Sequence, residues 1–178
     1  LLDANRRMRL LVAVVVPTSV GLIGVTSVAR EIQVVVPREY AEVEGPGVGG
    51  INVAQSYRFQ QVFAASEFTE VGPEGARLLG FYWRVDGGHD GPISYKAEQV
   101  KVTASNTSVE PNEMTSVFDD NITGPETVLL DQPYTLASEG RVPGGPNAFD
   151  YGVPFDVDFL YAPSQGNLLL DVTVVNAP

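Results

Sequence analysis

The chain has 178 residues, which is enough for one domain or two small ones. It contains no cysteine and one histidine, so disulfide scaffolds, Cys-based zinc sites and Cys nucleophiles are excluded and His-rich metal centres are disfavoured. The net charge of −11 argues against nucleic acid as a partner because phosphates would be repelled. With 44% hydrophobic residues, the chain is also too apolar for a disordered acidic tail.

The N-terminal part has the pattern of a secretory signal peptide. Three arginines lie between residues 6 and 9, and an uncharged, mostly apolar run follows at residues 10–25. Ser27 and Ala29 then supply the small side chains that a signal peptidase requires at the two positions before its cut. We therefore expect residues 1–29 to be a signal peptide with some upstream residues, its apolar part forming a helix.

Two alternatives exist for this segment: an uncleaved membrane anchor and a buried core helix. A spanning helix needs about 20 apolar residues, and this run is shorter and interrupted by Pro17 and Gly21. Cleavage after Ala29 would remove three arginines and one aspartate, which changes the net charge from −11 to −13. The remaining residues 30–178 are predicted to form one exported domain.

Helical periodicity is nearly absent after residue 30, and short β-like runs alternate with residues that favour turns. We expect a short helical turn at residues 64–68, and Pro154 predicts that its strand lies at a sheet edge or is bulged. The predicted fold is all-β, an antiparallel β-sandwich of the jelly-roll type. The predicted strands are residues 32–36, 57–63, 78–85, 94–104, 127–130, 149–159 and 168–175.

Alternation with a period of two indicates which side chains face the core. In the last strand Leu168, Leu170, Val172 and Val174 are expected to point inward, whereas Leu169 and Val175 indicate that the other face is covered too. In the strand at residues 149–159 the predicted inward set is Phe149, Tyr151, Val153, Phe155, Val157 and Phe159.

Two acidic loops are candidate calcium sites, since Ca²⁺ prefers closely spaced oxygen ligands. The loop at residues 86–91 (DGGHDG) offers Asp86 and Asp90, and a second cluster offers Asp119 and Asp120. The alternatives are a polar hairpin turn for the first loop and a solvated loop for the second. No cofactor is expected, with calcium as the candidate ion.

Adjacent aromatic residues are the candidate ligand-binding surface. Tyr82 and Trp83 cannot share one face of a strand, so one ring is expected to point outward, where it would stack on a sugar. The alternative for Trp83 is a place in the core.

Three other arrangements are weaker candidates for a functional site: two for catalysis and one for phosphate binding. Asp156 and Asp158 lie on one face of the predicted strand, an arrangement that would suit a pair of glycosidase carboxylates. A catalytic triad would have to use His89, which sits in a glycine-rich turn without a G-x-S-x-G motif nearby. The glycine-rich run at residues 45–50 follows several glutamates and precedes no lysine, which disfavours phosphate binding.

Two blocks of sequence together carry a family resemblance. The early block is residues 57–68 (YRFQQVFAASEF); the late block comprises residues 149–150 (FD), 159–163 (FLYAP) and 166–172 (GNLLLDV). These blocks resemble exported bacterial proteins of the PEP-CTERM-sorted type. Asp158 stands where these proteins carry proline. The resemblance implies sorting through a C-terminal Pro-Glu-Pro signal, which is absent from these residues, so we expect a fragment lacking its C-terminal part.

The shared blocks have a physical interpretation of their own. A tight turn at Gly166 and Asn167 is expected before a buried strand. Arg58, Gln60 and Gln61 lie among aromatic residues, where they are predicted to cross-link strands through polar contacts. The blocks are therefore expected to specify the fold and not a catalytic site.

The sequence predicts an exported, non-enzymatic surface or extracellular-matrix protein of the bacterial envelope or biofilm type. The alternatives are a calcium-dependent carbohydrate-binding module and, second, a glycoside hydrolase. The expected location is secreted or cell-surface. The expected partners are polysaccharide or envelope components, with contact to a membrane only through the signal segment or a missing C-terminal anchor.

Overall fold

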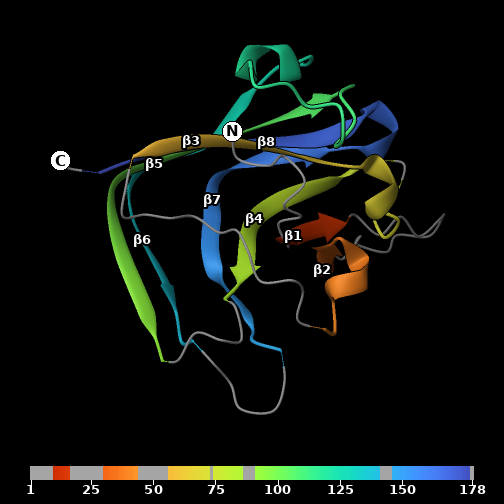
Figure 1. Ribbon diagram of the computed structural model, residues 1–178. Helices are drawn as coiled ribbons and strands as arrows, with labels where there is room; N and C mark the ends of the chain where they lie inside the picture. The colour runs from red at the N-terminus through yellow and green to blue at the C-terminus, as the bar shows by residue number, and fades with distance from the viewer. Residues whose placement is uncertain are drawn as a thin grey trace, which may run out of the picture.

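A computed structural model describes residues 10–16, 30–43, 56–72, 74–85, 91–140 and 146–176. These residues form an all-β fold of two antiparallel four-stranded sheets (Figure 1). The strands are β1 (Leu10–Val16), β2 (Arg30–Val36), β3 (Tyr57–Phe63), β4 (Ala76–Arg84), β5 (Ile93–Thr107), β6 (Thr127–Ser138), β7 (Phe149–Tyr161) and β8 (Asn167–Val175). Short 3-10 turns are η1 (Arg38–Tyr40), η2 (Ala65–Glu67), η3 (Phe118–Asn121) and η4 (Pro163–Gln165).

The strands alternate between the two sheets along most of the chain. Sheet A has the order β2-β1-β4-β7, and sheet B has the order β3-β8-β5-β6. All strand pairs are antiparallel. Only β1–β2 and β5–β6 join neighbours in the sequence, so the fold depends mainly on non-local pairing.

The hydrophobic core lies between the sheets and follows the predicted alternation. On β8, Leu168, Leu170 and Val172 are buried in this core, as expected. On β4, Phe81 and Trp83 face the same layer with their rings in edge contact, 4.4 Å between centroids. The tight turn before β8 is confirmed at Gly166, whose φ of 124° favours glycine.

Strand β7 confirms one prediction and corrects another. Pro154 lies on an edge strand and next to an irregularity, as its missing N–H requires. Between the pairs Leu78↔Phe159 and Gly80↔Pro154, two steps on β4 are matched by five on β7. The extra residues bulge out of the ladder, so Val157 is 48% exposed and not directed into the core as predicted.

At the N-terminus, residues 10–16 form strand β1 where the sequence analysis expected part of a helix. Their sequence, LLVAVVV, contains four valines, and β-branched side chains favour a pleated, paired backbone. β1 lies between β2 and β4 and is antiparallel to both. The other residues of the expected signal segment, 1–9 and 17–29, lie outside the described residues.

Candidate functional site

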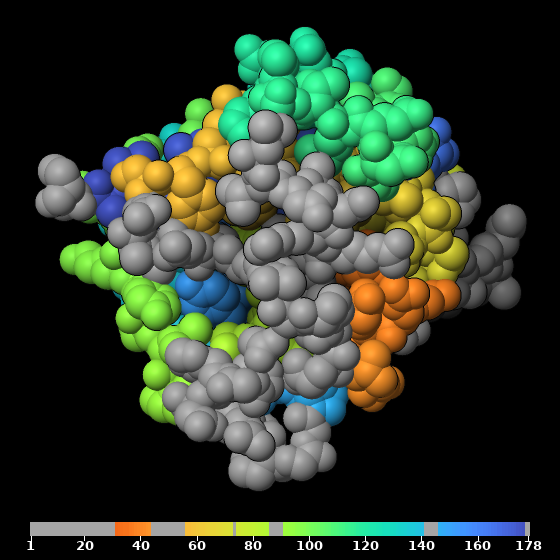
Figure 2. Space-filling model, in the orientation of Figure 1, coloured from red at the N-terminus to blue at the C-terminus, as the bar shows by residue number. Residues whose placement is uncertain are grey.

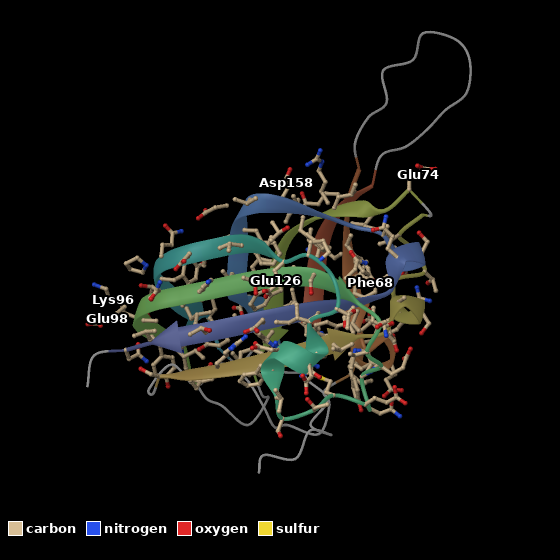
Figure 3. All side chains as sticks on the ribbon, turned by 90° about the horizontal axis from the view of Figure 1, so that it is seen from above. Phe68, Glu74, Lys96, Glu98, Glu126 and Asp158 are labelled. Atoms are coloured by element: carbon tan, nitrogen blue, oxygen red, sulfur yellow. The ribbon has the colours of Figure 1, made fainter. Side chains whose placement is uncertain are left out.

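A polar cluster lies on the outer face of sheet B, where an apolar strand carries one buried charge. Asp171 lies between Leu170 and Val172 on β8, so the alternation that directs these two inward turns Asp171 outward. Its side chain is nevertheless only 6% exposed. The connection between β5 and β6, residues 108–126, lies over this face (Figure 3) and forms a raised part of the surface (Figure 2, top).

Arg58 and Gln60 on β3 bind this carboxylate. Arg58 Nε donates to Asp171 Oδ1 over 2.9 Å, and Arg58 Nη2 donates to Oδ2 over 2.5 Å. Gln60 Nε2 adds a third donor to Oδ2, at 2.6 Å. The hydrogen bonds from Arg58 to Asp171 raise the pKa of Arg58 above its ordinary value, more than burial lowers it. The predicted cross-linking of strands is confirmed for Arg58 and Gln60, two of the three residues to which it was assigned.

The β5–β6 connection is attached to the cluster by an aromatic ring and a buried amide. The ring of Phe118 lies 4.8 Å from the guanidinium carbon of Arg58, within cation–π range. Asn121 is buried, and its Nδ2 donates to Gln60 Oε1 and to the Thr115 carbonyl. Its Oδ1 accepts from the Thr115 N–H, so the side-chain amide joins the connection to itself and to β3.

The electrostatics around Arg58 are acidic. Asp119 and Glu126, both from the β5–β6 connection, stabilise the Arg58 charge through space and add to the rise in its pKa. Glu126 also accepts a hydrogen bond from Thr103 Oγ1 on β5. One guanidinium is therefore surrounded by three carboxylates, which disfavours the binding of an anionic ligand here.

The arrangement is suited to holding strands together and poorly suited to acid–base chemistry. Both Asp171 oxygens accept hydrogen bonds, from donors on two side chains, and the carboxylate is covered. Glycoside hydrolysis needs two carboxyl groups that flank a scissile bond, one of them able to exchange a proton. A carboxylate that is neutralised and held by a bidentate arginine is poorly placed to exchange a proton with a substrate.

The structure describes two of the four predicted calcium ligands. Asp119 and Asp120 are exposed on η3. Asp86 and Asp90 lie outside the described residues. Across the part of the chain that the structure describes, no three His, Cys, Asp or Glu side chains come together as a metal would need.

The predicted aromatic surface is divided between the core and the outside of sheet A. Trp83 is 3% exposed and sits among core rings, so its ring has no free face for a sugar; its place is the core position that the sequence analysis weighed. Tyr82 is half-buried and lies against Gly80 and Gly152, where an added Cβ would meet its ring. Burial and the nearby Glu31 raise the pKa of its hydroxyl.

The two strand carboxylates considered for hydrolysis each have their own partner. Asp158 pairs with Arg77 at 2.9 Å, and Asp156 accepts from Gln132 Nε2 at 3.0 Å. Both carboxylates are exposed and lie on the bulged part of β7. Asp171 is a site residue that was not predicted, although a lone charge within an otherwise apolar strand was a usable signal.

Comparison of the chain with family models, curated proteins and solved structures gave no match. Among the described residues, no helix has the length and apolar character needed to cross a membrane.

Proposed function

We propose that the protein is an exported, non-enzymatic surface or extracellular-matrix component of the bacterial envelope or biofilm type. The observation that carries this proposal is the use of Asp171: the most enclosed charged group described is fully engaged in joining β3 to β8. The acidic net charge of −11 and the resemblance to PEP-CTERM-sorted proteins support it. Polysaccharide or other envelope components are the proposed partners.

Export through a signal peptide is part of this proposal. The basic, apolar and small-residue regions of residues 1–29 support cleavage after Ala29. The mature protein would then begin at Arg30, the first residue of β2. Cleavage would also remove β1 from sheet A.

A jelly-roll topology is the second part of the proposal, and the order of strand pairing supports it. Strand β5 pairs with β6, β4 with β7, and β3 with β8, so the pairs are nested around the β5–β6 connection. Such nesting is what results when one long antiparallel ribbon is folded over into two sheets.

The experiment is secretion followed by a binding assay on the secreted protein. The chain is expressed with its own N-terminus in a bacterium, and the mass of the exported product gives the cleavage site. We expect cleavage after Ala29. An uncleaved chain that stays in the cell membrane through residues 1–29 would contradict export as a free protein.

The purified exported protein is then mixed with insoluble polysaccharides, in calcium and again in EDTA. We expect no release of soluble sugar and no difference between the two conditions. Retention in calcium alone, lost in a variant with Asp119→Asn and Asp120→Asn, would replace the proposal with a calcium-dependent carbohydrate-binding module. Release of sugar that an Asp156→Asn and Asp158→Asn variant lacks would replace it with a glycoside hydrolase.

A further inference from the structure

The nested pairing has one member that does not follow the series. Counting outward from the β5–β6 pair, β4 joins β7 and β3 joins β8, each pair adding one earlier and one later strand. The next pair should join β2 to a strand that follows β8. In the structure, β2 pairs with β1, which precedes it in the chain.

Strand β1 occupies the place that the series assigns to the later strand. It lies between β2 and β4 in sheet A, antiparallel to both. In a jelly roll the closing strand lies between the first and third strands of the roll, which here are β2 and β4. A strand entering from the end of β8 would run in the same direction as β1, because it too must be antiparallel to β2.

We infer that in the exported protein this place belongs to a strand that follows β8 in the polypeptide, C-terminal to Pro178. The inference rests on the proposed removal of residues 1–29 and is carried by the pairing series. In the uncleaved chain β1 fills the place, and its backbone pairs with β2 and β4.

A strand that follows β8 needs a connection from the end of β8 to the end of β2. The fold already spans nearly the same distance in the opposite chain direction. β8 ends beside the start of β3, as the pair Tyr57↔Val174 shows, and the place begins beside the end of β2, as the pair Leu10↔Val36 shows. Residues 37–56 already join the end of β2 to the start of β3. A segment of similar length therefore suffices to lead from β8 into the place.

The residues of β2 and β4 that flank the position of β1 determine which side chains a strand in that position needs. Val34 and Val36 of β2 and Phe81 of β4 are buried core residues, and they lie opposite alternate positions of the occupant. These positions need apolar side chains. An empty place would uncover the three core residues and leave the N–H and C=O groups of two strands unpaired. The occupant is therefore a strand with apolar residues at alternate positions.

A strand graft tests the inference directly. The full chain is extended after Pro178 with a Gly/Ser linker as long as residues 37–56, followed by a second copy of residues 10–16. Gln33→Cys on β2 is combined with Ala13→Cys in the copy alone, because residues 13 and 33 are direct partners in the ladder. The native chain has no cysteine, so a disulfide after export can form only between these two positions within one chain, or between chains.

We expect the exported monomer to form this disulfide within the chain and to unfold at higher urea than the exported chain without the extension. The matched control moves the cysteine of the copy from the position of Ala13 to that of Val14, which pairs with Ile32 on the opposite face. It should not form the disulfide. A cleaved, folded graft without the disulfide would overturn the inference, as would a disulfide-linked dimer, which would assign the place to a second copy.

Mass measurement separates failure of this inference from failure of the proposed function. If residues 1–29 remain in the exported protein and cysteines at 13 and 33 in the native positions form a disulfide, β1 is the permanent occupant and the inference is wrong, whatever the binding assays give. The coding sequence downstream of Pro178 gives an independent result. A strand with apolar residues at alternate positions supports the inference, and a stop codon there overturns it.

Discussion

Removing the exposed partner of the Arg58–Asp171 pair should destabilise the protein more than neutralising the buried one. The Arg58 side chain is 38% exposed, whereas that of Asp171 is 6% exposed. Arg58→Met keeps most of the aliphatic stem but leaves a buried carboxylate whose remaining partner is Gln60. Asp171→Asn leaves a guanidinium that water can reach. Arg58→Met should therefore be the more destabilising of the two, because the charge that it leaves unpaired is the one that water cannot reach.

The magnitudes lie between those of buried and exposed ion pairs. Breaking a buried pair by removing one partner costs about 3–5 kcal/mol, and exposed pairs contribute roughly 0–1 kcal/mol. Because Arg58 is partly solvated, we expect Arg58→Met to lower the free energy of unfolding by about 2–3 kcal/mol. We expect Asp171→Asn to lower it by about 1 kcal/mol, and the double variant to resemble Asp171→Asn, which gives a coupling energy of about 2–3 kcal/mol.

Urea unfolding measures these differences, with the fluorescence of Trp83 as the signal. Trp83 is the single tryptophan and is 3% exposed, so its emission reports the core alone. The matched control is Arg77→Met, which breaks the Arg77–Asp158 pair with side chains 59% and 51% exposed and should cost less than about 0.5 kcal/mol. Equal costs for Arg58→Met and Arg77→Met, or a coupling energy near zero, would refute the reasoning.

Three further outcomes are expected. Gly166→Ala should lower the free energy of unfolding in urea by about 3 kcal/mol, because φ is 124° and the new Cβ would lie 2.7 Å from a main-chain carbonyl oxygen. The control is Gly91→Ala, which also has a positive φ but open space around the new Cβ, and it should cost about 1 kcal/mol. Asn121→Ala should cost about 2 kcal/mol and speed proteolysis within residues 108–126, and unchanged cleavage would contradict its anchoring role. Burial raises the pKa of Tyr151 from 10 to about 12, so its contribution to stability is complete below pH 10 and is lost as the pH rises towards 12. Unfolding titrations of Tyr151→Phe should therefore fall less steeply in this range than those of the wild type.

The strands that could be predicted from the sequence are those with a clear period of two. Residues 57–63 were predicted as a strand and form β3, and the predicted strand at residues 168–175 differs from β8 by one residue. The predicted strand at residues 127–130 was too short, since β6 continues to Ser138 through Asp131 and Pro133. β6 is an edge strand, where polar residues and proline are tolerated, and such a strand lacks the apolar pattern used to find it.

The candidate site could be predicted only in part, because its members come from distant parts of the chain. Arg58 and Gln60 stood out as polar residues among aromatic ones, and their cross-linking role followed from that setting. Their partner did not, because 113 residues separate Arg58 from Asp171 and the pairing of β3 with β8 is not visible in a linear pattern. The burial of Asp171 also depends on the β5–β6 connection, whose sequence shows no periodic pattern of apolar residues.

The two sheets differ in how they are completed, and this difference connects the site to the proposed closing strand. Sheet B is completed by residues within the described domain: the β5–β6 connection covers its outer face and Asp171 fastens β3 to β8. Sheet A is completed by β1, a segment that the proposed export would remove. If both proposals hold, folding of the exported protein ends only when a later strand enters between β2 and β4. The Arg58–Asp171 pair then has a second role, because it holds β8, the strand that precedes the later one, to β3 before sheet A is complete.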